Sequence, residues 1–205
     1  MEALLISTAV IFVAELGDKS QLMAMTFATR YRARDVIIGI TVATAIVHLA
    51  SVAIGAAIGE AFGDYQPAIN IVAGLAFLFF AAWTLRGDEL TDEEADKART
   101  SQGAAILAVG VAFFLAELGD KTMLATITLA THEGWFGTWI GSTIGMVVAD
   151  ALAIAVGALL GRQLPEKAIK YGAAAAFVVF GLLLVRQGWT ALGSVQGEDR
   201  CPASQ

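Results

Sequence analysis

One charged hexapeptide occurs twice in this chain, and each copy lies inside a long apolar segment. The first copy, residues 15–20, reads ELGDKS, and the second copy, residues 117–122, reads ELGDKT. A charged side chain at the centre of a membrane costs about 2.5–3.5 kcal/mol on insertion scales, so such groups usually mark a functional site. Because each copy carries three charges, the fold must bring both copies to a place where these charges are paired or used.

The composition places the rest of the chain in a membrane. Hydrophobic residues make up 57% of the 205 residues and charged residues only 16%, whereas soluble domains carry about 25% charged residues. A membrane-crossing helix needs roughly 20 apolar residues. The segments that meet this condition are residues 3–29, 35–60, 67–86, 103–131, 135–161 and 167–188. We therefore expect an all-α integral membrane protein with six transmembrane helices.

The two halves of the chain repeat one three-helix unit. An offset of 102 residues relates Gly55 to Gly157, and an offset of 100 relates Phe77 to Phe177. Three is an odd number, so the second unit enters the membrane from the opposite side, which gives the inverted repeats of many secondary transporters. The predicted division is residues 1–86 for the first three-helix repeat, 87–102 for an acidic linker, 103–188 for the second, inverted repeat and 189–205 for a disordered tail.

The positive charges predict the orientation. The loops after the first, third and fifth predicted helices contain Arg30, Arg32, Arg34, Arg86, Lys97, Arg99, Arg162, Lys167 and Lys170. The opposite side has only Arg186 and Arg200. Because lysine and arginine concentrate on the cytoplasmic side, we expect a multi-pass protein with both termini external and the linker cytoplasmic.

The carboxylates of the hexapeptide predict a metal site. Glu15 and Asp18 are three residues apart, as are Glu117 and Asp120, and residues at that spacing share one face of a continuous helix. If the two repeats pack face to face, the four carboxylates converge. Hard divalent cations such as Ca²⁺, Mg²⁺ and Mn²⁺ prefer such oxygen ligands.

The neighbouring side chains support this site. Lys19 and Lys121 reduce four negative charges to a net −2, which balances one divalent cation or two protons, and each lysine can pair with the glutamate four residues earlier. Ser20, Thr122 and Gln21 offer neutral oxygen ligands; Met123 takes the place of Gln21 in the second copy. Clustered, poorly solvated carboxylates take up protons readily, so one site can exchange metal for protons. The glycine in each copy permits close helix contact or a local break.

Two further groups inside predicted helices occupy matched positions. His48 corresponds to Asp150, and both are candidates for a proton route, although a buried histidine that only packs is an equally good interpretation. An isolated carboxylate inside a membrane is expensive, which makes Asp150 the better candidate. We expect phenylalanines such as Phe79 and Phe80 to face lipid.

With both motifs in view, the chain resembles the family of cation/proton antiporters that includes Golgi manganese/calcium transporters and bacterial manganese exporters. That family is marked by two E-x-G-D-[KR]-[ST] motifs, and residues 3–188 fit the whole pattern. The resemblance implies exchange of Mn²⁺, or Ca²⁺, for protons, with Glu15, Asp18, Glu117 and Asp120 as the binding carboxylates. The short linker and the lack of a targeting extension are similar to bacterial members and imply the cell inner (plasma) membrane.

Other interpretations stay open at this point. The charges can form ion pairs that only fix the helix register, the carboxylates can serve an exporter of another cation such as a basic amino acid, and Asp18 with Asp120 can form an aspartyl protease dyad. We expect no enzyme activity, no cofactor besides the transported ion and no nucleic-acid partner. The expected partners are a divalent metal ion, protons and the lipid bilayer; a homo-oligomer is allowed but not required. The motifs do not distinguish Mn²⁺ from Ca²⁺ or indicate a role for Cys201.

Overall fold

The computed structural model describes residues 1–62, 65–86, 105–160 and 166–198, and confirms the all-helical prediction for them. The helices are α1 (Glu2–Glu15), α2 (Lys19–Ala28), α3 (Ala33–Ala61), α4 (Gln66–Arg86), α6 (Ala105–Glu117), α7 (Lys121–Ala130), α8 (Trp135–Leu160) and α9 (Glu166–Glu198). The predicted acidic linker, 87–102, and Cys201 lie outside the described residues. Residues 189–198 belong to α9, so the prediction of a disordered tail is wrong for that stretch.

The first and fourth predicted helices are each broken at the motif. α1 ends at Glu15 and α2 begins at Lys19, and likewise α6 ends at Glu117 and α7 begins at Lys121. Gly17 and Gly119 have φ angles of 75° and 80°, in the left-handed region that only glycine adopts without strain. The prediction that Glu15 and Asp18 share a continuous helix face is therefore wrong. Of the two roles predicted for the motif glycine, close helix contact or a local break, the structure shows the local break.

Four of the described helical segments are long and apolar enough to cross a membrane. They are Ala33–Ala61, Gln66–Arg86, Trp135–Ala158 and Tyr171–Leu192, while Ala105–Glu117 is a shorter apolar helix. Large apolar side chains such as Leu75, Phe79 and Leu182 point outward and are 55–58% exposed. A water-soluble protein would bury such side chains, so this surface fits a lipid environment.

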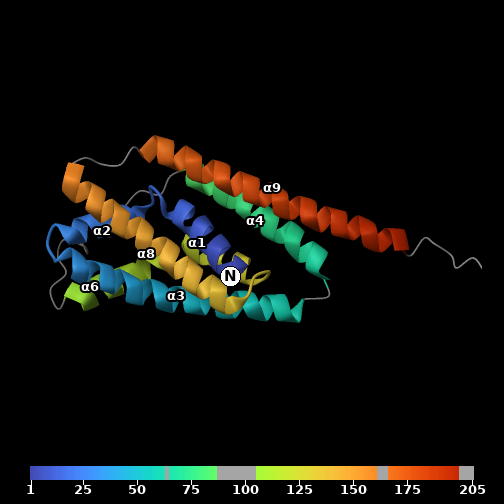
Figure 1. The fold of residues 1–205 in the computed structure, drawn as a ribbon, viewed down its shortest axis with the longest axis horizontal. Coiled ribbons are helices and arrows are strands. Elements are labelled where there is room, and N and C mark those ends of the chain that lie inside the picture. The colour runs from blue at the N-terminus through green and yellow to red at the C-terminus, as the bar shows by residue number, and fades with distance from the viewer. Residues whose placement is uncertain (63–64, 87–104, 161–165, 199–205) are drawn as a thin grey trace, which may run out of the picture.

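Helices of one half of the chain pack on helices of the other half. α1 lies along α8 and α6 along α3, while α2 contacts α8 and α7 contacts α3. α4 and α9 lie side by side along one edge of the molecule (Figure 1). α1, α2 and α3 of the first half correspond to α6, α7 and α8 of the second half. The contact α1–α8 is therefore equivalent to α6–α3, and α2–α8 is equivalent to α7–α3. This is the pattern that a pseudo-two-fold axis produces.

Equivalent residues meet where this axis passes. Thr44 and Met146 are related by the 102-residue offset, and the Thr44 hydroxyl lies 3.3 Å from the Met146 sulfur. Phe77 and Phe177 are also equivalent, and their ring centroids are 5.8 Å apart. Only positions near a two-fold axis can contact their own counterparts. The axis therefore passes between α3 and α8 and between α4 and α9.

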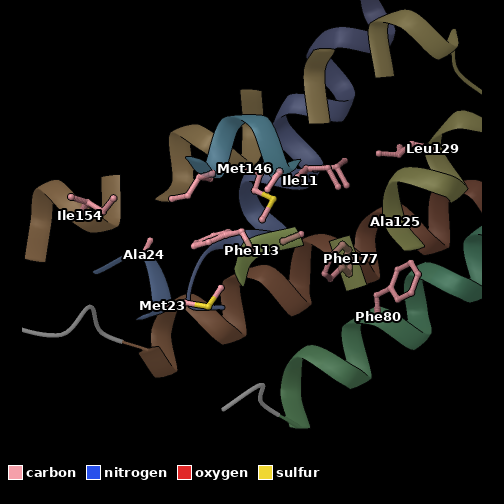
Figure 2. Close-up of a cluster of buried hydrophobic side chains, with 14 of the residues drawn as sticks. Ile11, Met23, Ala24, Phe80, Phe113, Ala125, Leu129, Met146, Ile154 and Phe177 are labelled. Atoms are coloured by element: carbon pink, nitrogen blue, oxygen red, sulfur yellow. The ribbon is translucent and has the colours of Figure 1, made fainter. Parts of the chain in front are cut away.

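A core of aromatic and aliphatic side chains surrounds this axis (Figure 2). Phe77, Phe113 and Phe177 are fully or almost fully buried. Phe80 is 3% exposed, so the prediction that it faces lipid is wrong, because it packs against Phe77 and Phe177 with centroids 5.8 and 6.1 Å away. Phe79, 58% exposed, does point outward.

Candidate cation site

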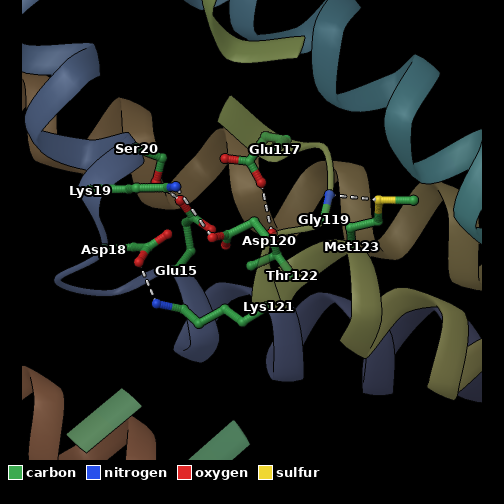
Figure 3. A network of polar contacts seen from close by, with 10 residues as sticks. All are labelled: Glu15, Asp18, Lys19, Ser20, Glu117, Gly119, Asp120, Lys121, Thr122 and Met123. Carbon is green, nitrogen blue, oxygen red and sulfur yellow. Dashed lines mark hydrogen bonds and ion pairs between the residues drawn. The ribbon is translucent and has the colours of Figure 1, made fainter. Parts of the chain in front are cut away.

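The two helix breaks face each other and bring both motifs together (Figure 3). Asp18 and Asp120 occupy the N-cap positions of α2 and α7, with extended backbone (φ −80°, ψ 164° and φ −74°, ψ 167°). Helix N-termini carry a partial positive charge that stabilises a nearby carboxylate. Both aspartates are buried, and so are Glu15 and Glu117 at the ends of α1 and α6. The four predicted carboxylates therefore lie in one buried region.

The residue four positions after each motif glycine supports the break. The Gly17 N–H donates to Gln21 Oε1 at 2.8 Å, and the Gly119 N–H lies 3.2 Å from the Met123 sulfur. Gln21 Nε2 also donates to the Ala149 carbonyl oxygen at 3.0 Å. Both ends of the Gln21 amide thus take part in hydrogen bonds, one within the motif and one to α8. Met123, which takes the place of Gln21 in the second motif, thus makes the equivalent contact with the backbone of Gly119.

Each lysine pairs with the aspartate of the other motif. Lys121 forms an ion pair with Asp18, and Lys19 Nζ lies 3.6 Å from Asp120 Oδ1. These ion pairs join each lysine to an aspartate of the opposite motif, whereas the sequence suggested the glutamate four residues earlier as a partner. The ion pairs link the two halves of the chain, and they are unequal. The Lys121 side chain is 4% exposed and the Lys19 side chain is 17% exposed.

Each glutamate is held by the hydroxyl of its own motif. The Ser20 hydroxyl donates to Glu15 Oε1, and Thr122 Oγ1 donates to Glu117 Oε2 at 2.7 Å. The other oxygens, Glu15 Oε2 and Glu117 Oε1, have no hydrogen-bond partner among the described residues. Ser20 and Thr122 thus orient the glutamates, which leaves one oxygen of each glutamate ready to accept a cation or a proton.

The two candidates for a proton route differ in their surroundings. Asp150 is fully buried in α8, interacts electrostatically with Asp18, Glu15 and Glu117, and has no hydrogen-bond partner in the described part of the chain. His48 is fully buried in α3, and neither ring nitrogen has a hydrogen-bond partner within the same residues. The structure therefore brings Asp150 to the motif carboxylates but gives His48 no hydrogen bond to them.

The carboxylates are close to one another without forming a complete metal cage. Within the described ranges, no three His, Cys, Asp or Glu side chains lie close enough together to hold one metal ion. The aspartates are paired with ammonium groups instead. A divalent cation that used these oxygens would have to draw the carboxylates together and compete with Lys19 and Lys121.

Comparison with known proteins points to ion transport. The family model of the divalent cation/proton antiporter GDT1 matches residues 3–92 and 105–192. A Vibrio cholerae protein named "Putative manganese exporter" is 37% identical over 131 residues, which cover 63% of this chain and 62% of the relative. No solved structure matches the chain.

Relatives from photosynthetic organisms match over more of the chain. Protein PAM71, chloroplastic, of Arabidopsis thaliana is 31% identical over 202 residues, covering 86% of this chain and 55% of the relative. A GDT1-like protein of Synechocystis is 28% identical over 191 residues, covering 84% of this chain and 91% of the relative. The chain thus spans less than two thirds of the length of the Vibrio and Arabidopsis relatives.

Proposed function

Because this chain belongs to the GDT1 family of divalent cation/proton antiporters, we propose that it exchanges Mn²⁺, or Ca²⁺, for protons across a membrane. The family consists of transporters and not of enzymes. The observation that supports the proposal best is the buried meeting of the two ELGDK motifs, each of which brings two carboxylates to the same region (Figure 3). Manganese is the favoured ion because the Vibrio relative is named for its export.

In this proposal Glu15, Asp18, Glu117 and Asp120 bind the cation. Each glutamate offers one oxygen without a hydrogen-bond partner in the described residues, and each aspartate offers a carboxylate that now pairs with a lysine. When the metal leaves, protons and ammonium groups replace it as the balancing positive charge. Asp150 is the proposed further proton acceptor, because it interacts electrostatically with three of the four carboxylates.

The proposed topology is two inverted repeats that cross the membrane six times in all. Each repeat contains two long helices and one pair of short helices separated by the motif. Helices broken near the membrane midplane are typical of ion sites in secondary transporters. The distribution of Lys and Arg supports a cytoplasmic linker and external termini, and we propose a bacterial plasma membrane as the location.

Transport by the purified full-length chain in proteoliposomes tests the proposal. An imposed pH gradient should drive Mn²⁺ across the membrane, and Mn²⁺ should in turn move protons. Glu15→Gln and Glu117→Gln should each reduce the exchange at least tenfold, because each removes a negative charge from the site. Glu60→Gln is the matched control, since Glu60 is an exposed residue near the end of α3. Wild-type vesicles that move neither Mn²⁺ nor Ca²⁺ against protons would contradict the assignment.

A further inference from the structure

Equivalent helix contacts differ between the two ends of the molecule. We define the α7–α8 end by the turn at residues 131–134 and the α2–α3 end by the turn at residues 29–32. α7 leads from the motif to the first end, and α2 leads from the motif to the second. α4 packs against α7, but the equivalent pair, α9 and α2, does not pack in this way among the described residues. The pseudo-two-fold symmetry is therefore incomplete.

A pair of equivalent glycines shows the difference most directly. Gly55 is buried in α3, and a methyl group added to it would overlap the Ile127 carbonyl oxygen and lie 2.7 Å from the Ala130 methyl group of α7. Its counterpart Gly157 in α8 is only partly buried. Within the part of the chain that the structure describes, a methyl group there would meet the Met25 side chain of α2, with the sulfur 2.9 Å away, and no backbone of another segment within 4 Å.

The ion pairs change in the same direction. Lys121, at the start of α7, is 4% exposed in its ion pair with Asp18, whereas Lys19, at the start of α2, is 17% exposed and 3.6 Å from Asp120. The α7 side of the site is thus tightly packed, and the α2 side is looser. The space around the two glycines, the packing of the helices and the exposure of the two lysines are separate observations. All three show closer packing on the α7 side than on the α2 side.

We propose that this is one of two conformations of the molecule, and that the contacts at Gly55 and Gly157 exchange between them. In the present conformation α7 is closed against α3, whereas α2 packs less closely on α8. In the other, α2 closes until the Met25 backbone contacts Gly157, while α7 withdraws from Gly55. The packing difference stands by itself; its link to transport rests on the proposed exchange function.

Gly157 provides the main argument for the second conformation. Among the described residues nothing in the present conformation requires a glycine at position 157, because its one close neighbour there is the flexible thioether of Met25. A glycine inside a helix costs about 1 kcal/mol relative to alanine. A close approach of the α2 backbone, like that of α7 at Gly55, would account for its presence.

The substitution Gly157→Ala tests the inference. The present packing alone predicts that a methyl group at position 157 leaves exchange unchanged, whereas the proposed second conformation predicts that it blocks exchange. The variant should unfold at the same temperature as the wild type or higher, and should bind Mn²⁺ in a calorimetric titration within twofold of the wild-type affinity. Its Mn²⁺/H⁺ exchange in proteoliposomes should fall at least tenfold. Gly172→Ala is the matched control, since a methyl group at Gly172 meets none of the described residues within 4 Å; it should exchange at the wild-type rate.

Labelling of single cysteines gives a readout that does not depend on transport. In a Cys201→Ser background, which removes the chain's one cysteine, Met25→Cys should react with a maleimide at least fivefold faster than Ile127→Cys. Gly157→Ala should increase this ratio further by holding α2 open.

The outcomes separate the two proposals. Wild-type exchange by Gly157→Ala together with an unchanged labelling ratio would overturn the two-conformation inference and leave the size of Met25 as the cause of the looser packing. A labelling ratio shifted by Gly157→Ala, in a protein whose wild type moves neither Mn²⁺ nor Ca²⁺ against protons, would support two conformations and overturn the proposed function.

Discussion

The side chains at the site are arranged by reciprocal pairing between the motifs. Lys121 lies beside Asp18, and Lys19 beside Asp120, so each half of the chain supplies the positive charge that the other half needs. A buried carboxylate without a partner is strongly destabilising. The lysines thus hold the two motifs together.

The unequal burial of the two ion pairs leads to a prediction. Lys121→Met should lower the free energy of unfolding by about 3–5 kcal/mol at neutral pH, because it leaves the buried Asp18 carboxylate without this counter-charge. Lys19→Met should have a smaller effect, since that ion pair is longer and more exposed. Thermal unfolding of the full chain in detergent measures both. Adding Asp18→Asn to Lys121→Met should restore most of the stability; equal losses from the two single variants would contradict the prediction.

The short helices depend on their ends and on the turns that join them to longer helices. α1, α2, α6 and α7 have 10–14 residues each, a length at which isolated helices are only marginally stable. They are held by packing on α3 and α8 and by the caps at Gly17 and Gly119. A hydrogen bond between Gln66 Nε2 and His132 Nδ1, 2.9 Å long, also ties the turn after α7 to the start of α4.

This tie should weaken in acid. The Gln66 amide donates to His132 Nδ1, which requires a neutral imidazole, and burial lowers the pKa of His132 from its usual 6.5. The stabilisation is therefore complete above pH 6.5 and is lost as the pH falls through the lowered pKa. The melting temperature of the wild type should drop more between pH 7.5 and pH 5 than that of His132→Gln, which cannot be protonated. Equal drops in both proteins would contradict this role.

The whole molecule is organised by the pseudo-two-fold axis. Thr44 meets its counterpart Met146, and Phe77 meets its counterpart Phe177, while α1–α8 and α6–α3 are equivalent pairs. The charged site lies between the two halves, and each half supplies side chains to both of its ion pairs.

The proposed topology gives a prediction at this scale. A protease site inserted in the predicted linker, 87–102, should be cut only from the cytoplasmic side, whereas a tag after residue 205 should be accessible only from outside. Six crossings place these points on opposite sides of the membrane. Right-side-out and inverted vesicles from the expressing cells distinguish the two sides. Accessibility of both points from one side would contradict the inverted repeat.

Several features of this protein followed from the sequence alone, because they depend on patterns along the chain. The apolar segments and the duplicated motif predicted the helical class, and the offset of 102 residues related positions such as Gly55 and Gly157 in the two halves. The carboxylates of the site could also be named, since ionisable side chains inside apolar segments are rare and usually mark a site.

Only the tertiary structure decided how these residues meet. A glycine permits either sign of φ, so the break at Gly17 depended on Gln21 and on the Ala149 carbonyl that holds it. The choice of Asp18 rather than Glu117 as the partner of Lys121 depended on the distance between helices. The difference between Gly55 and Gly157 cannot be read from two identical residues. It arises from how closely α7 and α2 approach the helices beside them, and a local pattern does not contain that information.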